Sequence, residues 1–175
     1  VQYWDVYLKG SNPSYYNKYV GYTDNSLFDY VNSIFEREYI GYRFIDEKIV
    51  PISDKHEVSA IREALENKYQ PVREHIAKAN TLLADRENPD YENSIKESIS
   101  AVEAMCCIIT GVRGSQSTLG NTLKKLETKG VVIHTAMKEG FKKLYGYTSD
   151  ADGIRHGGID FTKASEEDAR YMMVS

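Results

Sequence analysis

The chain has 175 residues, a length that fits one domain or one domain with a small appendage. Its 22 basic and 26 acidic residues give a formal net charge of −4, which excludes a uniformly basic nucleic-acid binder but allows a local basic patch. Hydrophobic residues make up 41% and charged residues 27% of the chain, so we expect a packed core rather than wholesale disorder. Apolar runs such as residues 105–109 are far shorter than the roughly 20 residues that span a bilayer, so we expect no membrane helix.

Cysteine and histidine usage argues against a disulfide or a structural metal site. Cys106 and Cys107 are the chain's two cysteines, and neighbours on a helix point about 100° apart, so they cannot form an ordinary bridge. Without a CxxC pair, and with four scattered histidines, we expect neither a metal nor another cofactor. Reduced cysteines and the lack of a signal-peptide pattern predict a cytoplasmic protein. The ends, Val1 and an apolar pattern stopping at Ser175, predict a piece of a longer protein.

Residues 1–52 form a section that holds most of the 14 tyrosines, whose amphipathic rings need both packing and hydrogen-bond partners. Asp24 is expected to cap a helix with one apolar face, made by Leu27, Phe28, Val31, Ile34 and Phe35. Farther on, two short apolar segments flank a polar turn over residues 46–48, and Pro51 follows them. This pattern predicts a small β-hairpin.

From Ser53 onward the apolar spacing is helical. Ser53 is expected to cap one helix, and Pro71 sits at the favoured first position of the next. A third helix starts after Pro89 and ends at Gly111, which fits a left-handed cap residue. Its predicted core stripe is Tyr91, Ile95, Ile99, Val102, Met105 or Cys106, and Ile109.

Three shorter helices follow, after Ser117 or Thr118, after Thr135 and after Ser165, where Ser165 and Asp168 resemble a capping box. Short loops between helices favour antiparallel neighbours. The sequence therefore predicts a mainly α fold, in which an antiparallel helical bundle over residues 53–175 follows the Tyr-rich section with its hairpin over residues 1–52.

Charge is distributed unevenly along the predicted bundle. Residues 113–147 contain seven basic and two acidic residues, a net charge of +5, so the rest of the chain carries −9. Lys and Arg at such density could hold a phosphodiester chain, whose affinity comes largely from counterion release. The alternative interpretation is that these lysines are the solvated faces of two short amphipathic helices.

Directly after this stretch, residues typical of catalytic sites lie close together between glycines. Asp152 and His156 are four residues apart, so on a helix the carboxylate would accept a hydrogen bond from the imidazole. A carboxylate beside a histidine fixes its tautomer and favours general acid–base chemistry. The alternative is an ordinary helix ion pair, which contributes only about 0.3–0.5 kcal/mol and gives little reason to gather these groups. The candidate catalytic residues are Asp150, Asp152, Arg155 and His156.

Several segments resemble bacterial AbiJ-type abortive-infection proteins, which are in turn similar to the HEPN superfamily of small helical bundles. The resemblance rests on the strings NSIKESISAVEAM at residues 93–105, TG at 110–111, TLG at 118–120, LKKL at 123–126, LYGYTSD at 144–150 and GIRH at 153–156, and extends back to GYRF at 41–44. It therefore implies a HEPN-like bundle, and many HEPN proteins are metal-independent ribonucleases of phage-defence and toxin systems.

The resemblance implies an endoribonuclease in which His156 moves a proton and Arg155 stabilises charge on the phosphoryl oxygens. RNA, with tRNA as one candidate, would be the substrate, a homodimer the working unit, and an antitoxin or sensor protein a further partner. RNA-binding residues would be Arg113, Lys142, Lys143, Tyr145 and Tyr147.

One departure from the family pattern leaves alternatives open. HEPN nucleases separate the catalytic Arg and His by several residues, whereas Arg155 directly precedes His156 here. Either the arginine has moved, or the site has lost cleavage and kept binding. A non-catalytic helical interaction or dimerisation module is therefore the alternative function, and a small-molecule or nucleotide sensor is a third.

Overall fold

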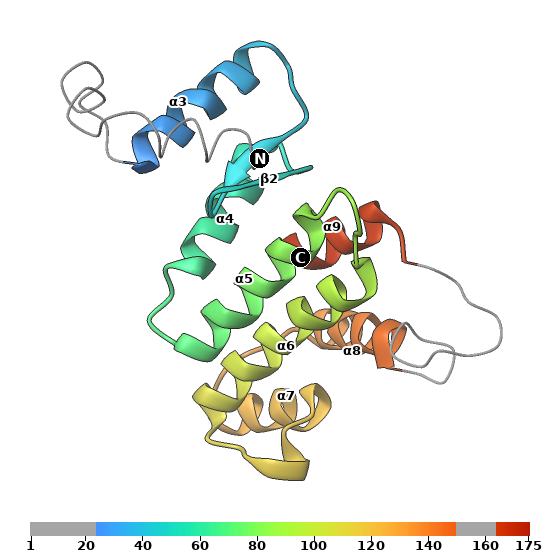
Figure 1. Cartoon of the computed structure of the whole chain (residues 1–175). Coiled ribbons are helices and arrows are strands. Elements are labelled where there is room, and N and C mark those ends of the chain that lie inside the picture. Colours follow the sequence, from blue (N-terminus) through green and yellow to red (C-terminus); the bar gives the residue numbers. More distant parts are fainter. Residues whose placement is uncertain (1–23, 150–163) are drawn as a thin grey trace. The chain divides into compact units, whose positions relative to one another are not determined.

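The computed structural model describes residues 24–149 and 164–175, and the chain divides into two compact units, residues 1–40 and 41–175 (Figure 1). The described residues form seven α-helices, one 3₁₀ turn and a two-stranded antiparallel hairpin. The mainly α class with a small hairpin is therefore confirmed. The predicted division at residue 52 stays a prediction.

In the first unit, the structure describes one helix, α3, over Asp24–Arg37. The predicted helix with a 3.6-residue apolar period is thus confirmed. After α3 the chain turns at Tyr39, whose φ of 54° lies in the left-handed region, and the amide of Ile40 donates to the carbonyl of Phe35 at 2.8 Å. This turn closes the end of the helix.

The second unit begins with the predicted hairpin, formed by β1 (Arg43–Ile45) and β2 (Lys48–Val50). Phe44 pairs with Ile49, which leaves Asp46 and Glu47 as a two-residue turn. Both turn residues have positive φ, 49° and 61°, as in the tight hairpin turns that usually carry Asn-Gly. The hairpin places its alternate side chains in the core, where Ile45, Val50 and Ile52 are almost completely buried.

Helix α4 covers Lys55–Leu65, and its N-cap is Asp54 instead of the predicted Ser53. The Asp54 carboxylate accepts hydrogen bonds from the backbone amides of His56 and Glu57, at 2.8 and 3.2 Å. These two bonds hold the pKa of Asp54 below its ordinary value. Since a carboxylate caps a helix at least as well as a hydroxyl, the one-residue shift follows from ordinary capping chemistry.

Helices α5 (Gln70–Ala84) and α6 (Tyr91–Thr110) form the centre of the second unit. Pro71 lies in the first turn of α5 and Gly111 ends α6 with a φ of 74°, both as predicted. The helices approach closely because small side chains line the contact, and the Ser94 hydroxyl donates to the Ala79 carbonyl at 2.9 Å. On the same helix pair, His75 Nδ1 lies 2.5 Å from a carboxylate oxygen of Glu97.

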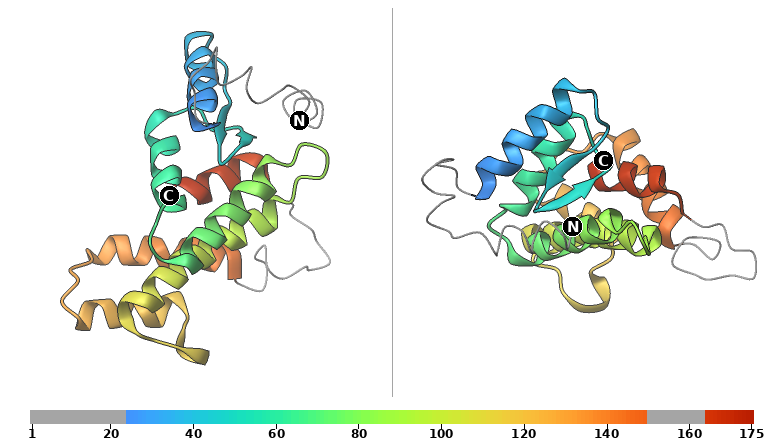
Figure 2. Two further views of the ribbon diagram at one scale, coloured as in Figure 1. Left: turned by 60° about the vertical axis from the view of Figure 1, so that its left-hand side comes forward. Right: turned by 45° about the horizontal axis from the view of Figure 1, so that its top comes forward.

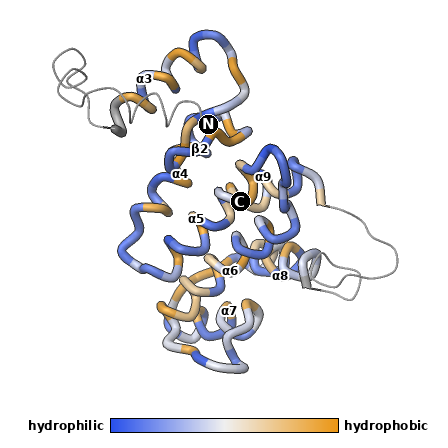
Figure 3. The backbone as a smooth tube through the Cα atoms, viewed as in Figure 1, coloured by the Kyte–Doolittle hydropathy of each residue, from blue (hydrophilic) through white to orange (hydrophobic). Residues whose placement is uncertain are grey.

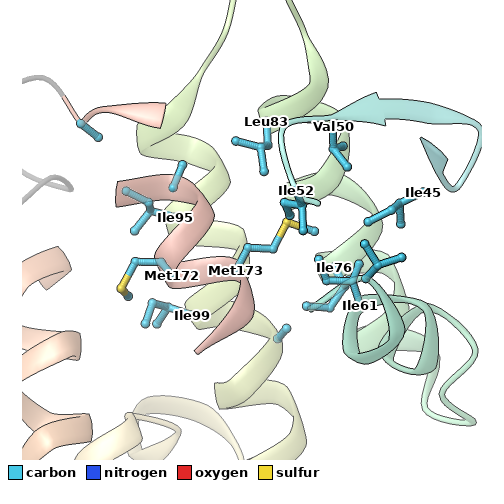
Figure 4. Packing of buried hydrophobic residues seen from close by; sticks show 14 of the residues in the cluster. Ile45, Val50, Ile52, Ile61, Ile76, Leu83, Ile95, Ile99, Met172 and Met173 are labelled. Atoms are coloured by element: carbon cyan, nitrogen blue, oxygen red, sulfur yellow. The ribbon is translucent and has the colours of Figure 1, made fainter. Parts of the chain in front are cut away.

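The main core is built around this pair (Figure 4). Helix α9 (Glu166–Val174) contributes Met172 and Met173, and its N-terminus has the predicted capping box of Ser165 and Asp168. The fully buried Asn80 of α5 donates from Nδ2 to the Ile45 carbonyl at 3.1 Å, which links the hairpin to α5. Arg170 of α9 reaches the Pro51 carbonyl at 3.2 Å. The hairpin, α5, α6 and α9 are therefore one packed body.

A second, smaller core joins α7 (Leu119–Thr128) and α8 (Thr135–Ser149) to the end of α6. These two helices lie side by side (Figure 2), after a 3₁₀ turn over Gly114–Gln116. The buried residues are Cys106, Leu119, Leu123 and Leu126, with Ile133, Phe141 and Tyr145 packed against them. Tyr145 also contacts the main core, so it connects the two clusters.

The predicted apolar stripe of α6 is only partly buried, which corrects the sequence interpretation. Ile95 and Ile99 are buried, but Val102 and Ile109 are 44% and 46% exposed. The contacts of Ala79 with Ser94 and of His75 with Glu97 place the start of α5 beside Val102, so Ile109 lies past the end of α5. Figure 3 shows this hydrophobic end of α6 beside α7.

The two cysteines lie near the C-terminal end of α6. Cys106 and Cys107 are free thiols, and burial raises the pKa of Cys106. None of the helices that the structure describes is long and apolar enough to cross a membrane.

The hairpin turn yields a stability prediction. Replacing Glu47 by Gly should raise the free energy of unfolding by about 0.5–1 kcal/mol, because Gly adopts a positive φ without a steric penalty. Urea denaturation of Glu47→Gly and Glu47→Ala beside the unmodified protein measures this effect. Only the Gly variant should be stabilised; equal stability of the Gly and Ala variants would contradict the turn conformation.

Candidate functional site

The four candidate catalytic residues, Asp150, Asp152, Arg155 and His156, lie outside the described residues. The structure does describe the two ends of the segment that contains them. Helix α8 ends at Ser149, and the chain is again described from Ala164, just before α9. Thr148 and Ala164 are both buried, so each end of the segment begins in the packed interior of the second unit.

Contacts between α8, α9 and α6 anchor these two ends. The Ala164 amide donates to a carboxylate oxygen of Glu92 at 3.2 Å. Partial burial raises the pKa of the Tyr147 hydroxyl, and the nearby carboxylate of Asp168 adds to the rise. Tyr147 of α8 therefore lies near the first turn of α9. The stretch 150–163 is thus tied at both ends to neighbouring parts of one core.

The two tyrosines predicted to stack on RNA bases have different surroundings. Tyr145 is half-buried and packs into both hydrophobic clusters, whereas Tyr147 is 46% exposed. An aromatic ring must present a free face to stack on a base. The exposed ring of Tyr147 meets this requirement better than the packed ring of Tyr145.

Five lysines belong to α7 and α8, and we call this set the α7–α8 lysine surface: Lys124 and Lys125 on α7, and Lys138, Lys142 and Lys143 on α8. Lys124, Lys125 and Lys143 are exposed, while Lys138 and Lys142 are half-buried. Arg113, the remaining predicted RNA-binding residue, is exposed in the connection between α6 and α7.

The two acidic residues of this region are both engaged. The ammonium group of Lys138 lies 2.9 and 2.8 Å from the two carboxylate oxygens of Glu127, which joins α8 to α7. Lys142 donates to Glu139 at 2.7 Å, one turn away on α8. The hydrogen bond and charge of Lys142 hold the pKa of Glu139 below its ordinary value, and Lys138 and Lys143 act in the same direction. Positive charge is therefore in excess even around this carboxylate.

Lys129, at the end of α7, has a structural role. Its ammonium group donates to the Ile109 carbonyl at 3.1 Å, in the last turn of α6. Carbonyls at a helix C-terminus lack intrahelical partners and favour a nearby cation. Lys129 therefore fastens α7 to α6.

Among the described histidines, His56 and His134 lie at the starts of helices, and His75 makes a contact between two helices. His56 lies in the first turn of α4, and Nδ1 of His134 accepts a hydrogen bond from the Ala136 amide at the start of α8. The pairing of His75 with Glu97 joins residues 22 positions apart, so no local pattern could indicate it. Among residues 24–149 and 164–175, no three His, Cys, Asp or Glu side chains form a group that could hold a metal ion.

The Glu127–Lys138 ion pair can be tested by its effect on stability. Glu127→Gln should lower the free energy of unfolding by about 0.2–1 kcal/mol, because the pair is partly exposed and screened by solvent. Glu87→Gln, at an exposed acid with no ion pair among the described residues, is the matched control. The difference between the two variants in urea denaturation should shrink in high salt. Equal stability at low salt would show that the pair does not hold α7 to α8.

Comparison with known protein families identifies the first part of the chain. Residues 2–67 match the family AbiJ N-terminal domain 4, a stretch that includes α3, the hairpin and α4. Searches of curated proteins and of solved structures found no match to the chain. The AbiJ resemblance is thus confirmed at the N-terminal part, while the HEPN likeness of the later helices stays a prediction. The chain therefore carries an AbiJ-type, abortive-infection-related domain at residues 2–67.

Proposed function

We propose that the protein acts in bacterial abortive infection as a metal-independent endoribonuclease of the HEPN type. The AbiJ-type domain supports the role in phage defence. The α7–α8 lysine surface is the observation that carries the RNA-directed activity, because its excess of positive charge lies on the helix that leads directly into the Arg155–His156 segment. Lys143 lies about 9 Å along the helix axis from the end of α8, at 1.5 Å per residue. RNA held on this surface would therefore be near the start of that segment.

In the proposed reaction, a ribose 2′-hydroxyl attacks the adjacent phosphorus. His156 moves the proton of the 2′-hydroxyl or delivers one to the leaving 5′ oxygen, while the bond between phosphorus and that oxygen breaks. Arg155 stabilises the negative charge that builds on the phosphoryl oxygens. Asp152 or Asp150 orients the imidazole. The products are a 2′,3′-cyclic phosphate and a 5′-hydroxyl, and two copies of the chain would face each other across one groove.

A non-catalytic interaction module is the second candidate function. The exposed apolar residues at the end of α6, Val102 and Ile109, favour it, together with Val132, which is 96% exposed. Apolar groups left uncovered on adjoining elements often mark a protein-binding surface. In this alternative the Asp-Arg-His cluster would stabilise an interface rather than cleave RNA.

RNA cleavage by single-residue variants separates the two functions. The purified protein is incubated with tRNA and with total RNA in EDTA, and the fragments are resolved on denaturing gels. Arg155→Ala and His156→Ala should each reduce cleavage by at least about 10²-fold, the usual contribution of a general acid–base or charge-stabilising group.

The matched control is His56→Ala, which removes an exposed imidazole from α4 and should leave cleavage unchanged. Circular dichroism verifies that all variants are folded. Absence of cleavage by the unmodified protein at every concentration, with its oligomeric state intact, would contradict the nuclease and favour the interaction module.

A further inference from the structure

We infer that Lys124 and Lys125 of α7 provide phosphate contacts of this surface in addition to Lys143 and Arg113, whereas Lys138 and Lys142 have mainly structural roles. The identity of the ligand as RNA rests on the proposed function. The division of roles rests on the ion pairs of the described residues. The sequence prediction placed Lys124 and Lys125 in the basic stretch 113–147 but named Lys142, and not these two lysines, among the RNA-binding residues.

Lys138 and Lys142 already have carboxylate partners that compensate their charges. Lys138 contacts both oxygens of Glu127, and its side chain is only 19% exposed. Moving it to a phosphate would break the link between α7 and α8 and leave Glu127 without its partner. Lys142 is held by Glu139 at 2.7 Å, so it too would have to give up a carboxylate to bind a phosphate.

Lys124 has an acidic residue at the helical spacing where ion pairs form. Glu127 is three residues further along α7, but both of its oxygens are bound by Lys138. No ion pair of Lys124 occurs within residues 24–149 and 164–175. Its ammonium group is exposed and available for an external anion.

Lys125 has no acid at all within reach along its helix. The residues three and four positions away are Asn121, Thr122, Thr128 and Lys129. Because like charges at helical spacing repel, Lys125 and Lys129 destabilise an isolated helix by about 0.2–0.5 kcal/mol. The packing of α7 is provided by Leu119, Leu123 and Leu126, so the fold itself does not need Lys124 or Lys125. Lys125 lies in the last turn of α7, where the helix dipole favours a cation, and a bound polyanion would be a further partner for its charge.

Helix α8 shares the basic excess of α7, whereas α6 and α9 are acidic, and α6 has three acids and one lysine. Helix α9 has three acids in its first turn, and α4 carries Glu57 near its start and Arg62 near its end. A chain with a net charge of −4 thus presents exposed lysines without a compensating acid at α7. This local asymmetry favours an RNA backbone over an acidic protein segment, because regularly spaced phosphates match a sequence-independent row of cations.

The test measures RNA binding separately from cleavage, in the complete chain carrying His156→Ala. Affinity for a fluorescent single-stranded uridine oligomer is measured by anisotropy over a series of salt concentrations. Adding Lys124→Gln and Lys125→Gln should weaken binding and reduce the slope of log K against log salt by about 1.4, or about 0.7 for each lost phosphate contact.

The matched control adds Lys55→Gln and Lys78→Gln, which changes the net charge equally at exposed sites on α4 and α5. Its slope should equal that of the His156→Ala parent. Equal slopes for the variant with the two α7 substitutions and for the matched control, or no RNA binding by the parent, would overturn the inference. Equally tight, α7-dependent binding of polyglutamate would overturn the assignment to RNA.

Failure of this inference and failure of the proposed function give different results. If the unmodified protein cleaves RNA but the α7 variant keeps the parent's slope, the phosphate contacts lie elsewhere and the nuclease stands. If the α7 variant loses slope but the unmodified protein never cleaves, α7 binds RNA and the nuclease proposal is wrong.

Discussion

The pairing of α5 with α6 is the contact on which the rest of the second unit depends. Small buried residues, including Ala79 and Ser94, let the two backbones approach, and a hydroxyl-to-carbonyl bond joins them. Helix α9 packs on this pair through its methionines, and the hairpin is linked to it through Asn80. Because these contacts share one cluster, a larger side chain at Ser94 would disturb the hairpin and α9 as well as α5.

The unequal lengths of the two helices connect this frame to function. The N-terminal half of α6 is covered by α5 and α9, but the C-terminal part extends beyond α5 and carries α7 and α8 on the side of Cys106. Lys129 and the Glu127–Lys138 pair fasten these helices to α6 and to each other. The fold thus separates a packed centre from a charged extension, and the segment with Arg155 and His156 connects the extension back to α9.

The helix ends could be predicted from the sequence, because they depend on residues that are close together in the chain. Pro71, Gly111 and the Ser165–Asp168 capping box act within one helical turn, so their patterns identified helix ends correctly. The exposure of Val102 and Ile109 depends on how neighbouring helices pack against α6, which periodicity does not encode. The pairing of Glu127 with Lys138 likewise depends on tertiary structure, and it decides which lysines are free to bind a ligand. The catalytic cluster lies outside the described residues and stays a prediction.

In the proposed mechanism, the chain cleaves RNA by using the substrate's own 2′-hydroxyl. The most direct measurement is the mass of the product ends after cleavage of a defined RNA oligomer, beside the same oligomer with one 2′-deoxy nucleotide at the cleaved position. If the 2′-hydroxyl is the nucleophile, we expect 2′,3′-cyclic phosphate and 5′-hydroxyl ends, and no cleavage at the deoxy position. Products with 5′-phosphate and 3′-hydroxyl ends, or cleavage that continues at the deoxy position, would contradict it.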